Sequence, residues 1–144
     1  MDPYARRMIK TDFFHAKRDV VTRVAVVLDG HLENRNLQLI QPLSRAFYEK
    51  MIIEFIATDD PNAQPGSTVQ PIAYIAFVEL QRSGVILVGD ELEWNGKVIG
   101  TIAGYDDTHM PNHQNVIVSV AKRISGKELG ISVEDTITIK GFQK

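Results

Sequence analysis

Hydrophobic positions recur with the spacing of β-strands through most of this chain. The segment 20–28 is dense in valine and closes on Asp29-Gly30, whereas 72–80 is apolar at nearly every position, as in a strand buried on both faces. The segment 91–94 alternates between acidic and apolar residues, which places the two kinds of side chain on opposite faces of a strand. These patterns predict strands at 20–28, 51–57, 72–80, 91–94, 97–105, 116–120 and 136–139.

A tight turn and a glycine-rich strand indicate how the strands are arranged. Asn95-Gly96 is a two-residue hairpin signal, and the strand after it, 97–105, carries glycines that favour tight curvature, as at a barrel corner. The segments 88–94 and 133–139 share one pattern: an apolar residue, a turn ending in aspartate and an alternating strand. Two similar halves of a barrel would produce this repetition. The predicted fold is mainly β, a small closed or nearly closed β-barrel with one or two short helices.

Three segments interrupt the strand pattern. Residues 42–50 predict a short helix, because a proline suits its first turn and apolar residues follow at helical spacing. Residues 58–71 contain three prolines, a glycine and several polar residues, which is typical of an exposed loop. We interpret residues 1–17 as an N-terminal arm that includes one helical turn, so that a single barrel domain spans 18–144.

The bulk composition excludes several classes of protein. With 144 residues and 44% hydrophobic positions, the chain has the size and composition of one globular domain. It has no cysteine, which excludes disulfides, thiolate metal sites and cysteine nucleophiles. A net charge of −2 leaves no basic excess to neutralise phosphates, so we expect no nucleic-acid partner. The apolar runs are too short to cross a bilayer and no secretory signal is evident, so we expect a cytoplasmic protein without membrane insertion.

The order and spacing of the predicted elements resemble a known family. The elements in question are the strand 74–80, the hairpin 89–98, the strand 99–104, a polar connector, the strand 115–120 and a closing turn and strand at 133–139. Over 22–139 this layout resembles the glucitol/sorbitol-specific enzyme IIA component of the sugar phosphotransferase system, a small cytoplasmic β-barrel phosphocarrier. That family carries its phosphoryl-accepting histidine on the strand matching 74–80, where this chain has Ile75 and Phe77. The resemblance therefore implies the barrel fold, while neither Ile75 nor Phe77 can accept a phosphoryl group.

One polar segment collects most of the residues that could carry chemistry. Residues 104–115 contain two carboxylates, two of the four histidines, carboxamides and a hydroxyl. The segment lies between two predicted strands, which would anchor both its ends to a rigid scaffold. We predict that a small-molecule ligand would contact this segment. The candidate ligand-binding residues are Asp106, Asp107, Thr108, His109, Asn112 and His113.

Three uses of this segment stay open. His109 and His113 together with Asp106 are suitable ligands for zinc or another divalent ion, although Pro111 disfavours a helical pair of histidines. One histidine would instead act as a base or phosphoryl acceptor, with Thr108 or a carboxylate fixing its tautomer. The third use is a structured connector, because Asp, Asn, Thr and Pro are the residues that a wide turn needs.

Motifs of the common enzyme classes are missing from the sequence. It contains neither a phosphate-binding loop nor a dinucleotide fingerprint nor a nucleophile elbow. We therefore expect a non-enzymatic small-molecule-binding or regulatory module that needs no cofactor. The alternative is a phosphocarrier or metal-dependent enzyme that uses the segment 106–113, and a purely structural subunit is a third hypothesis. Self-association into a homo-oligomer is left open.

Overall fold

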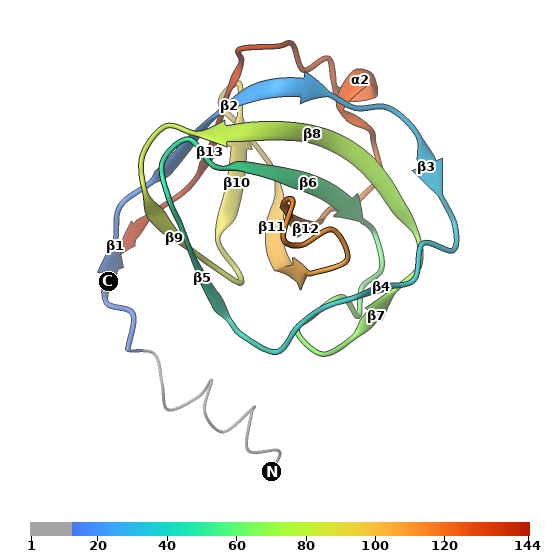
Figure 1. Ribbon diagram of the computed structural model, residues 1–144, viewed down its shortest axis with the longest axis horizontal. Coiled ribbons are helices and arrows are strands. Elements are labelled where there is room, and N and C mark those ends of the chain that lie inside the picture. The colour runs from blue at the N-terminus through green and yellow to red at the C-terminus, as the bar shows by residue number, and fades with distance from the viewer. Residues whose placement is uncertain (1–12) are drawn as a thin grey trace.

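The computed structural model describes residues 13–144, and its main feature is a closed β-barrel (Figure 1). The last strand of the barrel returns to pair with the first, which confirms the predicted fold class. Neighbouring barrel strands are antiparallel except for one parallel pair, β6 with β12. In order around the barrel, the strands are β2 (Val20–Val27), β13 (Thr136–Ile139), β10 (Glu91–Trp94), β11 (Lys97–Asp106), β12 (Gln114–Ser119), β6 (Ile52–Thr58) and β8 (Ile72–Leu80).

The barrel separates two hydrophobic clusters. Phe55 of β6 and Val116 of β12 are register partners, and both belong to the large cluster that fills the interior. Their neighbours Ile56 and Ile117 point the other way, because side chains alternate along a strand, and they belong to a smaller cluster. The smaller cluster also contains Leu37, so it lies between the barrel wall and the chain that crosses its outer face. Even-numbered positions of β6 therefore face this outer layer.

Short strands join the long connections to the barrel. Figure 1 shows the β5–β9 pair and the β4–β7 pair beside the ring of barrel strands. β7 lies within the loop predicted at 58–71, and its Val69 is fully buried. The additional elements are β1 (Ala16–Lys17), β3 (His31–Leu32), β4 (Leu37–Gln38), β5 (Ser44–Phe47), β7 (Thr68–Val69), β9 (Gly84–Leu87), β14 (Phe142–Gln143) and the helix α2 (Gly126–Leu129).

The helix predicted at 42–50 is wrong. Residues 44–47 form β5, which pairs with β9 in an antiparallel register. Ala46 is exposed and Phe47 is buried, which is the alternation of a strand. Backbone pairing with 84–87, a partner strand absent from our prediction, outweighs the local helical spacing because tertiary hydrogen bonds override weak propensity.

The one helix among the described residues is α2, which lies outside the predicted strands. Ser125 accepts a hydrogen bond from the Glu128 backbone N–H, and the Glu128 side chain accepts one from the Ser125 N–H, so the two residues form a capping box. Gly130 ends the helix in the left-handed conformation, with a φ of 90°. In residues 13–144, no helix has the length and apolar character required to span a membrane.

The two ends of the described chain lie together. β1 pairs with β14, so that Ala16 and Lys17, the last residues of the predicted arm, form part of the folded domain. Lys17 Nζ also forms an ion pair with the buried carboxylate of Asp90, 3.1 Å away. The helical turn predicted within residues 1–12 lies outside the described residues.

The repeated turn-and-strand pattern has a common geometry. The Asp90 carboxylate accepts a hydrogen bond from the Leu87 N–H at 2.9 Å, and the Asp135 carboxylate accepts one from the Ser132 N–H at the same distance. β10 and β13, the strands that follow these turns, pair side by side in the barrel. Each aspartate therefore closes the turn that starts its strand, as the sequence pattern predicts.

Candidate functional site

The connection between β11 and β12 holds all six predicted site residues, and Asp106 fixes it to the barrel. One carboxylate oxygen of Asp106 accepts hydrogen bonds from the Thr108 N–H at 2.9 Å and from Asn115 Nδ2 at 3.1 Å. The other oxygen accepts one from the Gln38 N–H at 3.0 Å. Asp106 is only 2% exposed, so these donors rather than water satisfy its charge. Its role in this arrangement is structural.

Gln114 holds the same connection from the other side. Its Nε2 donates to the Asp106 carbonyl oxygen and to the Asp107 carboxylate, both at 2.7 Å. The Gln114 side chain is buried at the start of β12, whereas Asp107 is exposed. The connection therefore has a rigid base and a displayed outer side, the arrangement expected of a loop that binds a ligand.

A buried histidine–carboxylate pair lies below the connection. His113 Nε2 is 3.0 Å from Glu54 Oε1, and the two side chains are 9% and 6% exposed. Asn112 Nδ2 is 3.0 Å from the other ring nitrogen, His113 Nδ1. Because the NH2 group of Asn112 can only donate, Nδ1 accepts and Nε2–H donates to Glu54. Both ring nitrogens of His113 are thus engaged.

Glu54 was missed by the sequence analysis, although it is the only charged residue of β6. It faces outward from the barrel, opposite Asn115 in the parallel register of β6 and β12. Burial raises the pKa of Glu54, while the hydrogen bond from His113 and the electrostatic influence of the nearby basic residues His113, His109 and Arg35 act in the opposite direction. A lone carboxylate within an apolar strand was the available signal.

Three further side chains complete this group. The His109 ring stacks on the His113 ring with centroids 5.0 Å apart, and the Phe77 ring meets His113 edge-on at 4.9 Å. Arg35 NH2 lies 3.3 Å from His109 Nε2. We refer to Arg35, Glu54, Phe77, His109 and His113 as the histidine cluster. It unites residues of β6, β8, the β11–β12 connection and the segment after β3.

An open pocket adjoins this part of the β11–β12 connection. It has a volume of about 310 Å³, and the predicted site residues Asp107 and Thr108 form part of its wall. We refer to it as the loop pocket. Its lining residues are Asn36, Gln38, Ile40, Asp106, Asp107 and Thr108. The structure thus divides the predicted set: Asp106, Asp107 and Thr108 line the loop pocket, whereas His109, Asn112 and His113 lie in or against the histidine cluster.

The structure does not assemble the predicted metal ligands. Asp106 uses both carboxylate oxygens to accept hydrogen bonds, and His113 uses both ring nitrogens. Among residues 13–144, no group of three or more His, Asp or Glu side chains is placed to hold a metal ion. Of the three predicted metal ligands, only His109 has a side chain without a hydrogen bond to the β11–β12 connection or to Glu54; its Nε2 lies next to Arg35 instead.

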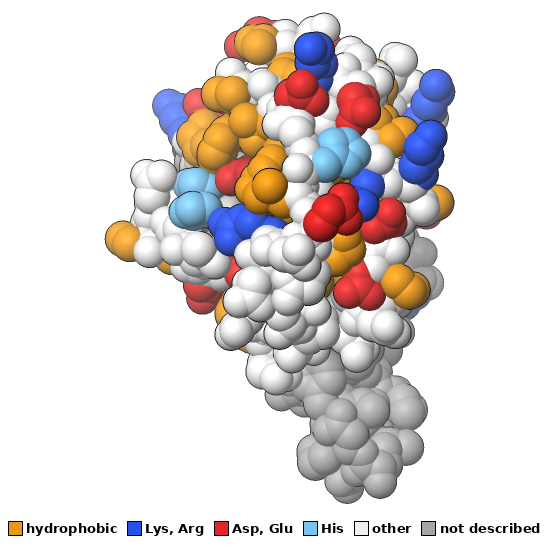
Figure 2. Space-filling model, turned by 90° about the vertical axis from the view of Figure 1, so that its right-hand side faces the viewer, with side chains coloured by type: hydrophobic (Ala, Val, Ile, Leu, Met, Phe, Trp, Pro, Cys, Tyr) orange, Lys and Arg blue, Asp and Glu red, His pale blue; other side chains and the backbone are white. Residues whose placement is uncertain are grey.

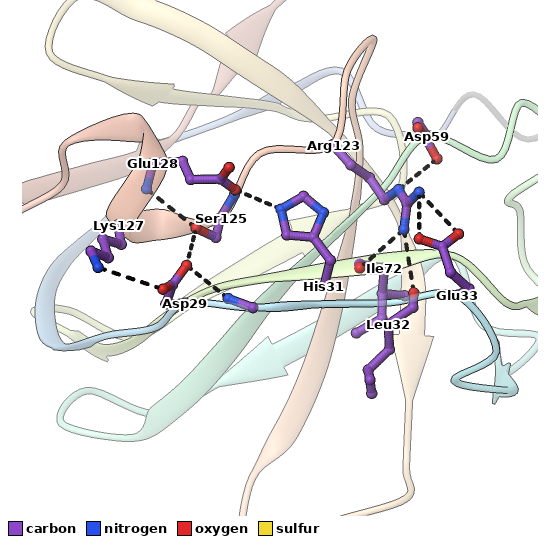
Figure 3. A network of polar contacts seen from close by, with 11 residues as sticks. Asp29, His31, Leu32, Glu33, Asp59, Ile72, Arg123, Ser125, Lys127 and Glu128 are labelled. Carbon is purple, nitrogen blue, oxygen red and sulfur yellow. Dashed lines mark hydrogen bonds and ion pairs between the residues drawn. The ribbon is translucent and has the colours of Figure 1, made fainter.

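A second group of charged side chains connects β3 with α2 (Figure 3). His31 of β3 hydrogen-bonds Glu128 of α2, and Arg123 forms ion pairs with Asp59 at 3.1 Å and with Glu33 at 3.2 Å. The hydrogen bond with His31, together with those at the cap of α2, lowers the pKa of Glu128 to about 2. Every acidic group here has a basic partner, so this network holds loops together. Figure 2 shows this face, where histidine, basic and acidic side chains reach the surface near hydrophobic ones.

A second open pocket lies at another part of the barrel. It has a volume of about 350 Å³ and is lined by Trp94, Asn95, Asp135 and Thr136. The Trp94 indole N–H donates to the Asp135 carboxylate at 2.9 Å. We refer to it as the Trp94 pocket. The loop pocket is the stronger candidate because three of the six predicted site residues line it and none lines the Trp94 pocket.

Comparisons with known proteins assign this chain to a family. No curated protein and no solved structure matches it. The match to a family covers most of the chain, including the barrel, the histidine cluster and the loop pocket. Since residues 14–140 match the family described as "Family of unknown function (DUF6917)", the chain belongs to that family.

Proposed function

We propose that this protein is a non-enzymatic small-molecule-binding or regulatory β-barrel module and that its ligand occupies the loop pocket. The observation that carries the proposal is the anchoring of the β11–β12 connection by the buried side chains of Asp106 and Gln114. That anchoring presents Asp107 and Thr108 to the pocket in fixed positions. Rigid display of polar groups reduces the entropy cost of binding.

The pocket lining suggests the chemistry of the ligand. Asn36, Gln38, Asp107 and Thr108 contribute amide, carboxylate and hydroxyl groups, and Ile40 adds one apolar side chain. Such groups both donate and accept hydrogen bonds, so they match a molecule rich in hydroxyl groups. A sugar or a sugar alcohol is the class of ligand that we propose.

The histidine cluster favours binding over catalysis. Within the histidine cluster, both ring nitrogens of His113 are hydrogen-bonded and Glu54 accepts from one of them, so this pair is already engaged and is not presented to a substrate. Ile75 is buried in the core and Phe77 packs on His113, and neither side chain can carry a phosphoryl group. We propose that any kinship with the sugar phosphotransferase components is one of fold and ligand class.

Calorimetric titration with glucitol and glucitol 6-phosphate tests this proposal. Asp107→Asn keeps the oxygen that accepts from Gln114 but removes the charge, and Thr108→Ala removes the hydroxyl. We expect each variant to weaken binding about tenfold, the usual effect of losing one good hydrogen bond. Glu91→Gln and Thr101→Ala, at exposed positions of β10 and β11, are the matched controls and should leave the affinity unchanged.

The same titrations contain the outcomes that count against the proposal. Loss of binding in the control variants to the same degree would show that the effect is general rather than local. Binding that survives both Asp107→Asn and Thr108→Ala unchanged would place the ligand elsewhere. Failure of both compounds to bind the wild-type protein would remove the proposed ligand class.

A further inference from the structure

Arg35 has an unusual partner for a half-buried arginine. Its guanidinium lies 3.3 Å from His109 Nε2, and His109 is itself a base. Arginine keeps its proton and can only donate, so His109 Nε2 must accept and the ring is neutral in this contact. Within residues 13–144, Arg35 forms no ion pair with an Asp or Glu side chain. By contrast, Arg123 is paired with two carboxylates, Asp59 and Glu33.

The histidine cluster has more basic groups than acidic ones. Glu54 is its single carboxylate, and that side chain is directed to His113 rather than to Arg35. A guanidinium partly removed from water needs a compensating anion. Glu54 interacts with Arg35 only at a distance, and none of the described Asp or Glu side chains forms an ion pair with it.

Arg35 and His109 are the chain neighbours of two residues that line the loop pocket. Arg35 directly precedes Asn36, and His109 directly follows Thr108, and both of these neighbours line the pocket. A ligand that extends past Asn36 and Thr108 would meet the guanidinium of Arg35 and the imidazole of His109. Arginine and histidine side chains are common partners of phosphate and carboxylate groups, and the planar guanidinium binds either anion through two parallel hydrogen bonds.

We infer that Arg35 and His109 form an anion subsite that binds the phosphate or carboxylate group of a ligand. The inference rests on the proposed function for the remainder of the ligand, which would lie in the loop pocket. An anion between the two side chains accepts hydrogen bonds from the guanidinium and from His109 Nε2. His109 Nε2 then changes from an acceptor to a donor, and the proton that it needs comes from water. The ligand class becomes a phosphorylated or carboxylated polyol.

Nitrogen-15 NMR of histidine-labelled protein tests the subsite directly. The wild-type protein is titrated with inorganic phosphate, and separately with acetate, at constant pH and constant ionic strength. We expect a saturable change of the His109 Nε2 resonance from the unprotonated toward the protonated range. A response to phosphate alone assigns the subsite to phosphate groups, and a response to acetate alone assigns it to carboxylates.

Matched variants separate a specific subsite from general electrostatic attraction. Arg35→Gln and His109→Gln should each weaken binding of the responding anion at least about tenfold, because each replaces a charge-assisted hydrogen bond by one from a neutral amide. Arg45→Gln removes the same charge from another partly buried arginine, on β5, and should change the affinity by less than about twofold. Equal weakening by Arg35→Gln and Arg45→Gln, or no saturable change of His109 in the wild-type protein, would overturn the inference.

The subsite and the loop pocket can fail separately. If inorganic phosphate binds as expected but glucitol 6-phosphate binds no more tightly, the anion subsite stands and the proposed pocket ligand is wrong. If glucitol 6-phosphate binds and Asp107→Asn weakens it while Arg35→Gln does not, the pocket stands and the anion subsite is wrong.

Discussion

Replacing Asp106 by alanine should destabilise the protein by about 3 kcal/mol or more. The substitution leaves the backbone N–H groups of Gln38 and Thr108 and the amide of Asn115 without their acceptor, in a place where Asp106 is 2% exposed. The Asn115 donor is buried and the other two are partly buried. An unsatisfied buried donor costs about 1–3 kcal/mol, and the three losses share one site, so they do not add fully. Urea-induced unfolding measures the difference in the free energy of unfolding.

Asp107→Ala is the matched control for this substitution. Asp107 is the next residue along the chain and carries the same charge, but its side chain is exposed. Its loss removes one hydrogen bond, from Gln114 Nε2, and should cost about 1 kcal/mol or less. If Asp106→Ala and Asp107→Ala destabilise the protein equally, the β11–β12 connection is not anchored by Asp106 as described.

The second large effect concerns the carboxylate of Glu54. Glu54→Ala deprives the buried His113 Nε2–H of its acceptor and leaves a space beside it, at a combined cost of about 2–4 kcal/mol. Glu54→Gln has nearly the same shape, and its Oε1 can accept from Nε2–H, so its cost should be about 1 kcal/mol or less. Unfolding experiments on both variants near neutral pH provide the comparison. Equal costs for the two variants would contradict the hydrogen bond between Glu54 and His113.

The pH dependence of Glu54 follows from the direction of its shift. Burial raises its pKa above the ordinary value of 4.5, so the folded protein holds this proton more tightly than the unfolded chain. The part of the stability that comes from the tighter binding of this proton is fully present below the unfolded pKa and is lost as the pH rises through the folded pKa. A titration of its carboxyl carbon by NMR should give a midpoint above 4.5. A midpoint below that value would mean that His113 outweighs burial.

The barrel strands could be predicted because their burial follows the sequence pattern closely. The continuous apolar run at 72–80 became β8, which pairs with β2 and β6 and is mostly buried along its length. Strands of this kind are specified by which faces they bury, and that is visible in the order of apolar residues. The turns that end in Asp90 and Asp135 could also be predicted from the sequence, because the aspartate side chain itself closes each turn.

The errors occurred where a distant partner determines the local structure. Residues 44–47 have helical spacing, yet their backbone hydrogen bonds are made with 84–87, and no local pattern reveals such a partner. The helix α2 is a different case, since Ser125 and Glu128 form the serine-to-glutamate spacing of a capping box. That signal was present but is short, and only one turn of helix follows it.

The candidate site was predicted in part for the same reason. Its loop residues lie close together in sequence, so their polar character was evident in one segment. Glu54 and Arg35 reach the histidine cluster from β6 and from the segment after β3, and only the closed barrel places them beside His109 and His113. The roles of the loop residues also depend on three-dimensional contacts. The Asp106 carboxylate, for example, accepts a hydrogen bond from the Gln38 N–H of a distant segment.

Backbone amide NMR with added glucitol 6-phosphate tests the central claim most directly, because it reports where the ligand sits without any substitution. Our account predicts that the amide resonances of 35–40 and 106–113 change together, with one saturation curve, while those around the Trp94 pocket stay constant. Changes concentrated at Trp94, Asn95 and Asp135, with 35–40 and 106–113 unaffected, would contradict the account.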